Sequence, residues 1–251
     1  MEEKVHFNSL NEVTDSKWAE LAKKRIYFGH QSVGKNIMDG VQDILNENPK
    51  IKLKIIELTK TTDLSEGTFM HSKIGKNKFP RSKTDAFADT MRNGFGNNVD
   101  IAFFKFCFVD GIEGNEDVQA IFKYYRETMS NLSRDYKKTQ FVHVTMPLMV
   151  AQTGVKAWIK KILGRPLGGT INNQRLNAYN ELLNIEYARK APVFDLAKVE
   201  STFSNGKRST FTIDNKSYFS LIPDYTYDGS HLNEIGRKKV AEQLLLFLAN
   251  L

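Results

Sequence analysis

The feature that most constrains the fold is an alternation of strand-like apolar runs with segments of helical apolar spacing. Residues 24–28, 51–58, 101–109, 141–146 and 192–196 read as strands. Helices are expected at 32–48, 84–92, 116–134, 172–190 and 232–251, with a weaker one at 152–163. Strands that alternate with helices favour a mainly parallel sheet covered on both faces. We therefore expect an α/β fold, a three-layer α/β/α sandwich around a five-stranded sheet, in a single domain over residues 1–251.

Composition excludes several other classes of protein. Hydrophobic residues make up 41% of the chain, with 17 Phe and 9 Tyr, so the chain has enough apolar side chains to form a core. No apolar run approaches the roughly 18 residues that span a bilayer, and we expect no membrane association. The net charge of +7 is scattered and accompanies no base-reading motif, so we expect no nucleic-acid partner. A single cysteine excludes an intramolecular disulfide framework.

The start of the chain does not determine the cellular compartment of the protein. The first ten residues contain no signal-peptide pattern, which fits the cytoplasm, but a leader removed from an exported protein would leave the same start. The sequence does not indicate an oligomeric state.

Two segments lack a strand or helix pattern and read as loops: the long Gly- and Lys-rich segment 59–83 and the segment 164–169. Because a loop as long as 59–83 is uncommon in a compact domain, we expect it to carry function.

The first candidate for chemistry is Ser32, in the turn Gly29-His30-Gln31-Ser32-Val33-Gly34. In parallel α/β sheets the ligand crevice lies beyond the carboxyl ends of the strands, where this turn falls. A serine at a helix start is commonly an N-cap. It is alternatively a nucleophile whose oxyanion is stabilised by the amides of the helix N-terminus.

The second candidate is the pair Asp228 and His231, three residues apart just before the last helix. A carboxylate in that position can accept the imidazole Nδ1 proton and leave Nε2 as the base for a serine hydroxyl. Alternatively, Asp228 is only the N-cap of the last helix. The pattern gains weight because it lies opposite a serine turn in a chain of alternating strands and helices.

With these residues the sequence resembles the SGNH, or GDSL-type, hydrolases, over nearly the whole chain. In that family a serine follows the first strand, and the triad's aspartate and histidine form an Asp-x-x-His block near the C-terminus. The segment 100–110 resembles the family's third block, which ends in Gly-x-Asn-Asp. The resemblance implies a flavodoxin-like fold, hydrolysis of carboxylic esters, often acyl groups on sugars, and Ser32, Asp228 and His231 as the catalytic triad.

The sequence departs from the family pattern at the oxyanion hole. Gly-His-Gln-Ser replaces Gly-Asp-Ser, and Val109 and Cys107 stand where the family has its oxyanion asparagine and its glycine. We expect replacement donors from the backbone of Ser32 or Val33, from Gly75 and from the side chain of Asn77. A Gly-x-Asn sequence in a lysine-rich loop is equally typical of a simple turn.

The remaining polar candidates have weaker patterns. His30, in the serine turn, and Lys105, in an apolar strand, are expected to line the substrate site, and Lys105 has Asp100 or Asp110 as a possible structural partner. Cys107 and His143 are expected in the core. The histidines are not spaced as metal ligands, and no glycine motif for a phosphate or a dinucleotide is present, so we expect neither a metal nor a cofactor.

The sequence favours a serine esterase that acts on short acyl esters, such as acetyl esters, possibly on carbohydrate. A catalytically silent binding protein for carbohydrate or another ligand, on the same fold, is the alternative, motivated by the missing asparagine. An acyltransferase is a third reading that the sequence does not separate from a hydrolase. Basic residues of the long loop suggest an anionic or polyhydroxylated substrate, although they would equally solvate the loop: Lys73, Lys76, Lys78, Arg81 and Lys83.

Overall fold

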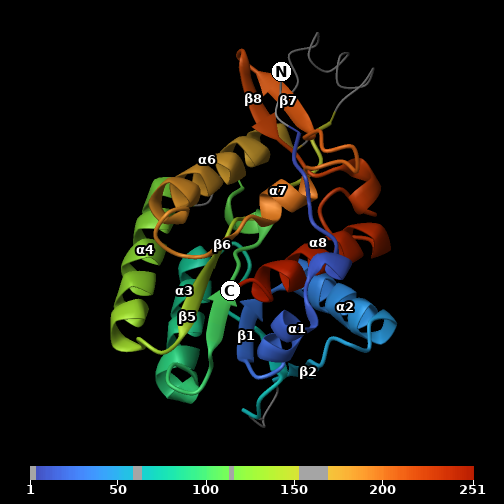
Figure 1. Cartoon of the computed structure of the whole chain (residues 1–251). Helices are drawn as coiled ribbons and strands as arrows, with labels where there is room; N and C mark the ends of the chain where they lie inside the picture. Colours follow the sequence, from blue (N-terminus) through green and yellow to red (C-terminus); the bar gives the residue numbers. More distant parts are fainter. Residues whose placement is uncertain (1–3, 59–63, 113–115, 153–168) are drawn as a thin grey trace.

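The computed structural model describes residues 4–58, 64–112, 116–152 and 169–251. Six parallel strands form one sheet in the order β2-β3-β1-β4-β5-β6 (Figure 1). Their bounds are β1 Arg25–His30, β2 Lys54–Glu57, β3 Thr68–Lys73, β4 Ile101–Phe104, β5 Gln140–Val144 and β6 Val193–Phe194. Without the short β2 at the edge, this is the flavodoxin-like order that the resemblance implies.

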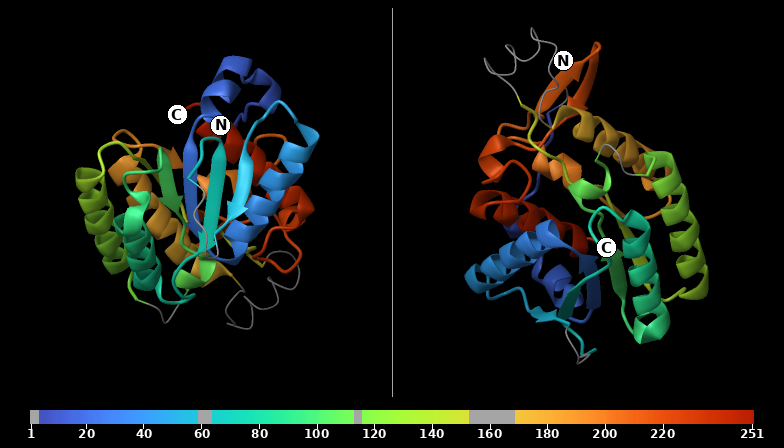
Figure 2. Two further views of the ribbon diagram at one scale, coloured as in Figure 1. Left: turned by 90° about the horizontal axis from the view of Figure 1, so that it is seen from below. Right: turned by 180° about the vertical axis from the view of Figure 1, so that it is seen from behind.

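Helices cover both faces of the sheet, which confirms the three-layer sandwich (Figure 2). One layer contains α1 Asp15–Leu21, α2 Ser32–Glu47 and α8 Glu234–Leu248, and the other contains α3 Pro80–Thr90, α4 Val118–Asp135 and α6 Thr170–Tyr187. The short helix α7 Leu196–Glu200 follows β6. None of the helices in the described ranges is both long and apolar enough to cross a bilayer.

An antiparallel hairpin of β7 Thr210–Ile213 and β8 Lys216–Phe219 extends from the sandwich beside α6. Asp214 and Asn215 form its turn with φ of 48° and 61°, a left-handed conformation that Asp and Asn tolerate better than other side chains. Asn177 of α6 anchors the hairpin through both backbone groups of Phe219.

The expectation of five strands was wrong, because the segment 59–83 is not one long loop. It contains β3 and the first turn of α3. The strand β3 was missed because polar residues occupy buried positions in it, among them Thr68 and His71, each 3% exposed or less. The expected loop is therefore reduced to the connections on either side of β3.

The strand expected at 101–109 is also too long, since β4 ends at Phe104, where its pairing with β1 ends at Gly29. The chain then turns through a 3₁₀ segment at Phe108–Asp110 while remaining buried. The other strands and helices that were expected within the described residues lie at their places, with ends that differ by a few residues, except that β2 and β6 are shorter. The helices α1 and α7 and the hairpin of β7 and β8 were not among the expected elements. The helix expected at 152–163 and the loop at 164–169 lie almost entirely outside the described residues.

Candidate active site

Ser32 stands at the start of α2, directly beyond the carboxyl end of β1. Its neighbour Gln31 occupies the N-cap position but does not cap the helix with its side chain, and Ser32 is the first helical residue. The hydroxyl of Ser32 therefore does not serve as the N-cap, which was the structural alternative. The first-turn amides of α2, which include those of Ser32 and Val33, have no partner within the helix and are available to other acceptors.

The structure brings Ser32 together with the two distant residues that the sequence singled out. Nε2 of His231 lies 3.0 Å from Oγ of Ser32. On the other side of the ring, Nδ1 of His231 lies 2.6 Å from Oδ2 of Asp228. A carboxylate only accepts, so Nδ1 carries the proton and Nε2 is left to accept the hydroxyl proton of Ser32. The three side chains are thus connected in the same order as in a serine-histidine-aspartate triad.

Asp228 is fixed by its own turn and does not cap the last helix. Its Oδ1 accepts the backbone N–H groups of Ser230 and His231, each at 2.8 Å. The cap of α8 is Asn233, whose side chain accepts the N–H of Gly236 at 3.0 Å. Partial burial raises the pKa of Asp228, but the hydrogen bonds from His231 and Ser230 outweigh burial and hold its pKa below the ordinary value.

Two aromatic rings contact the imidazole. Phe108, in the 3₁₀ segment after β4, meets the ring of His231 edge-on with centroids 5.4 Å apart. Tyr227 lies parallel to it at 6.1 Å and is 68% exposed. The histidine thus has one face against a partly apolar wall and a solvent-exposed aromatic ring beside it, which limits the orientations that the ring can take.

The segment from Ile74 to Asn77 is attached to the serine turn by Gln31. The side-chain amide of Gln31 donates to the backbone carbonyl of Ile74 at 2.7 Å and to that of Gly75 at 2.9 Å. Gly75 has a φ of +55°, and a Cβ there would lie 2.5 Å from the backbone nitrogen of Lys83, so glycine is required. The side chain of Gln31 therefore holds Gly75 next to the turn that contains Ser32.

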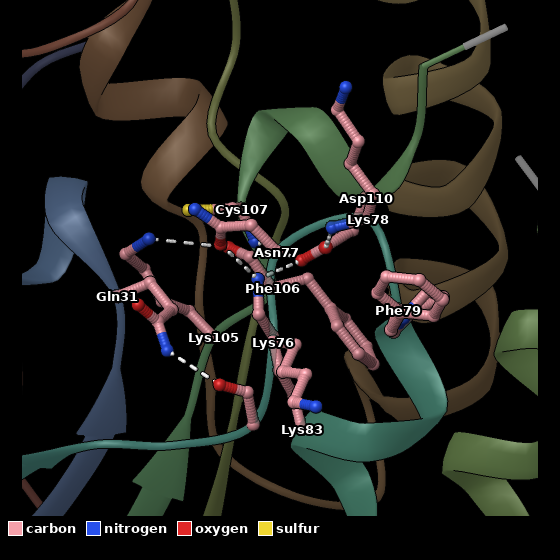
Figure 3. Close-up of polar contacts among 12 residues, drawn as sticks. Gln31, Lys76, Asn77, Lys78, Phe79, Lys83, Lys105, Phe106, Cys107 and Asp110 are labelled. Atoms are coloured by element: carbon pink, nitrogen blue, oxygen red, sulfur yellow. Dashed lines mark hydrogen bonds and ion pairs between the residues drawn. The ribbon is translucent and has the colours of Figure 1, made fainter.

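Asn77 lies in the same segment and is exposed, and its Oδ1 accepts a hydrogen bond from Nζ of Lys83 at 2.9 Å. Figure 3 shows Asn77 in a cluster with Lys83, Lys105, Cys107 and Asp110. Cys107 is buried, with Sγ 3.9 Å from Oγ of Ser32. The segment 100–110 therefore contacts Ser32 through Cys107, and the side chain of Val109 is apolar.

His30 and Lys105 are both buried, whereas they were expected to line the substrate site. His30 is fully buried, with Nε2 2.9 Å from Nδ1 of His71 and Nδ1 2.9 Å from the carbonyl of Gln31. Burial lowers the pKa of His30 to about 3, so the ring is neutral and supports the serine turn from beneath.

Lys105 is 1% exposed, and its Nζ donates to the carbonyl of Phe106 at 3.2 Å. Burial lowers its pKa. Neither Asp100 nor Asp110 forms an ion pair with it within the described ranges; Asp110 pairs with Lys83. Lys105 therefore lies in the interior of the protein and is not exposed at the surface.

Sequence reasoning missed the roles of Gln31, Lys83 and Asp110. Lys83 was taken for a solvated loop lysine, yet it is fully buried on α3. Its spacing of four residues from the buried Phe87 was the available signal, since positions four apart share a helix face. Within the described residues, no three His, Cys, Asp or Glu side chains gather closely enough to hold a metal ion.

Comparison of the sequence with protein-family models and with curated proteins finds no match. Solved structures do match. A protein from Bacteroides fragilis described as a candidate acylhydrolase has a TM-score of 0.53 at 15% identity, over 98% of this chain and 99% of that chain. A candidate platelet activating factor from Streptococcus pneumonia has a TM-score of 0.52 at 16% identity, over 93% and 90%.

A third similar structure is LAE5, an alpha/beta hydrolase enzyme from the metagenome of Lake Arreo, with a TM-score of 0.51 at 11% identity, over 90% and 95%. At these identities the likeness concerns the fold, and it extends over nearly the whole of each chain. The chain therefore has the α/β/α hydrolase fold that its resemblance to the SGNH hydrolases implies.

Proposed function

We propose that the protein is a serine hydrolase of carboxylic esters. The observation that carries the proposal is the continuous chain from Oγ of Ser32 through His231 to Asp228, with steps of 3.0 Å and 2.6 Å. His231 and Asp228 are both partly exposed, so the packing of the core does not account for this arrangement. The fold of the similar structures, two of them described as an acylhydrolase and a hydrolase, supports the same reading.

In the proposed reaction, Nε2 of His231 takes the proton of Ser32 as Oγ forms a bond to the ester carbonyl carbon. The tetrahedral intermediate collapses when the bond to the alkoxy oxygen breaks, and His231 returns the proton to the leaving alcohol. Water, activated by the same Nε2, then attacks the acyl-serine and releases the carboxylic acid. Asp228 stays ionised throughout and stabilises the imidazolium.

The oxyanion that forms at the carbonyl needs hydrogen-bond donors, and the apolar side chain of Val109 does not supply one. The proposal assigns them to the backbone N–H of Ser32 or Val33, the N–H of Gly75 and the side-chain amide of Asn77. Gln31 supports this assignment, because it ties the Gly75 segment to the serine turn. Donors fixed in this way lower the energy of the transition state without having to reorganise during the reaction.

The substrate class follows from the mouth of the site. Lys76 and Lys78 are exposed beside Asn77, whereas Lys83 is buried and Arg81 pairs with Glu116 through a 2.9 Å contact. These two exposed cations and the exposed Tyr227 suit a polar or anionic ester, such as an acetylated sugar. Transfer of the acyl group to a sugar hydroxyl in place of water would use the same residues.

The test is hydrolysis of p-nitrophenyl acetate by the wild-type protein and by Ser32→Ala. We expect the variant to lose at least about 1000-fold in kcat/KM, because removing a triad member leaves only the catalysis of the oxyanion hole and of binding. Circular dichroism of the variant serves as the fold control. Equal turnover by the two proteins would reject the serine mechanism, and no turnover by the wild type would favour a silent binding protein.

A further inference from the structure

The strongest unexplained feature next to the site is a charged pair with no exposure to solvent. Nζ of Lys83, on α3, lies 2.5 Å from Oδ2 of Asp110, and both side chains are 0% exposed. Lysine and aspartate are almost never fully buried unless they are paired. The mechanism above uses neither of them.

Asp110 ties this pair to the segment behind the nucleophile. Its Oδ2 also accepts the backbone N–H of Cys107 at 2.7 Å, and its Oδ1 accepts that of Lys78 at 2.9 Å. Cys107 in turn contacts Oγ of Ser32 through its sulfur. The carboxylate therefore holds Lys83 in a fixed position relative to both the third block and the Asn77 segment.

The second contact of Lys83 determines how the Asn77 amide is turned. An ammonium group only donates, so the amide atom 2.9 Å from Nζ is the oxygen, and the NH₂ group faces away from Lys83. Figure 3 shows Asn77 close to Lys83 and Cys107 in the same cluster. The positive charge of Lys83 next to the amide oxygen also polarises the amide of Asn77 and strengthens its N–H group as a donor.

We propose that Lys83, held by Asp110, is a positioning residue that presents the amide N–H of Asn77 to the oxyanion. In this way a lysine-asparagine couple from the 77–83 segment replaces the donor that Val109 cannot supply. The proposal rests on the proposed ester hydrolysis at Ser32. Lys83 itself touches neither the substrate nor the reacting atoms.

The experiment is a double-mutant cycle of Asn77→Ala and Lys83→Met, with kcat and KM measured on p-nitrophenyl acetate. We expect Asn77→Ala to lower kcat about 100-fold to 1000-fold with KM changed by less than about threefold, as for the loss of one oxyanion donor. Lys83→Met should lower kcat in the same direction by about 10-fold or more. In the Asn77→Ala background it should have no further effect on kcat, because the lysine acts through the asparagine. Losses that multiply, or a full kcat for Lys83→Met, would overturn the proposal.

A second pair of variants covers the case in which Lys83→Met does not fold. Lys83→Met combined with Asp110→Asn leaves no unpaired buried charge. Asn77→Asp keeps an oxygen against Lys83 but removes the N–H, so it should lose as much kcat as Asn77→Ala. Retention of full kcat by Asn77→Asp would contradict the proposal even if no Lys83 variant folds.

The matched control is Lys123→Met, which removes an exposed lysine on α4 and should keep wild-type kcat and KM. An inactive wild type would mean that the proposed ester hydrolysis fails. An active wild type and an active control beside an unaffected Lys83→Met would mean that only the positioning role fails. The two failures are thereby distinguished.

Discussion

At the scale of single residues, the most unusual ionisable group outside the site is Glu200, at the end of α7. Its Oε2 accepts the backbone N–H of Leu148 at 2.7 Å, whereas its buried Oε1 has no hydrogen-bond partner in the part of the chain that the structure describes. Burial raises the pKa of Glu200 to about 8. The side chain is therefore mostly a neutral acid at pH 7.

The raised pKa of Glu200 predicts a loss of stability at alkaline pH. Because the pKa of Glu200 is higher in the folded state than in the unfolded state, proton binding to Glu200 stabilises the folded state. This stabilisation is fully present below pH 4.5, the pKa of the unfolded state, and is lost as the pH rises through about 8, the pKa of the folded state. Glu200→Gln has no proton to lose and should lack this decline. The urea midpoint of the wild type should therefore fall relative to that of Glu200→Gln between pH 5 and pH 8. Parallel pH profiles for the two proteins would contradict the prediction, and Glu127→Gln, an exposed change on α4, is the control.

The buried histidines act at the opposite end of the pH range. Burial lowers the pKa of His30 to about 3 and that of His143 to about 4, against an ordinary value of 6.5. Their stabilising effect is present above pH 6.5 and is lost as the pH falls toward those values. Stability should accordingly be greatest between these acidic and alkaline limits.

At the scale of elements, the contact between Ser32 and His231 depends on how α2 packs against α8. Ser32 begins α2, and His231 lies two residues before Asn233, the cap of α8. The two helices meet at Gly40, where a Cβ would lie 2.4 Å from the backbone carbonyl oxygen of Arg237. The 3.0 Å contact between Ser32 and His231 therefore rests on a helix crossing that admits only glycine.

Gly40→Ala should separate the two helices and affect both stability and catalysis. We expect a loss of about 1–3 kcal/mol in the free energy of unfolding, as for other overpacked sites, and a lower kcat. Urea denaturation and ester hydrolysis measure the two effects. Asn46→Ala, on the exposed face of α2, should leave both unchanged. A Gly40→Ala protein with wild-type stability would show that the crossing tolerates a side chain.

The strands and helices were predictable to different degrees. The alternation of elements gave the parallel sandwich, because hydrophobic period and crossover topology are local properties of the sequence. The strand β3 escaped prediction, since Thr68 and His71 are polar residues whose burial depends on partners far along the chain. The end of β4 at Phe104 depends likewise on where β1 stops pairing.

At the scale of the whole molecule, the candidate site joins segments that lie 199 positions apart in the chain. The close approach of Ser32, Asp228 and His231 was predictable, because they lie at the start of α2 and in the turn before α8, the first and last long helices of the sandwich. The ion pair of Lys83 with Asp110 was not, because the spacing of Lys83 from Phe87 indicates a shared helix face but not the partner that the fold brings to it. Pairings between residues far apart in the chain depend on the packing of the whole fold.

The central claim is that Ser32 is an activated nucleophile. Intact-mass measurement after exposure to a fluorophosphonate tests this before any substrate is known, because attack by an activated serine oxygen expels fluoride and leaves a stable phosphonyl group on the protein. We predict one adduct on the wild-type protein, located at Ser32 by peptide mapping, and none on Ser32→Ala. A folded wild-type protein that gains no adduct, or one that is equally labelled after Ser32→Ala, would contradict the account.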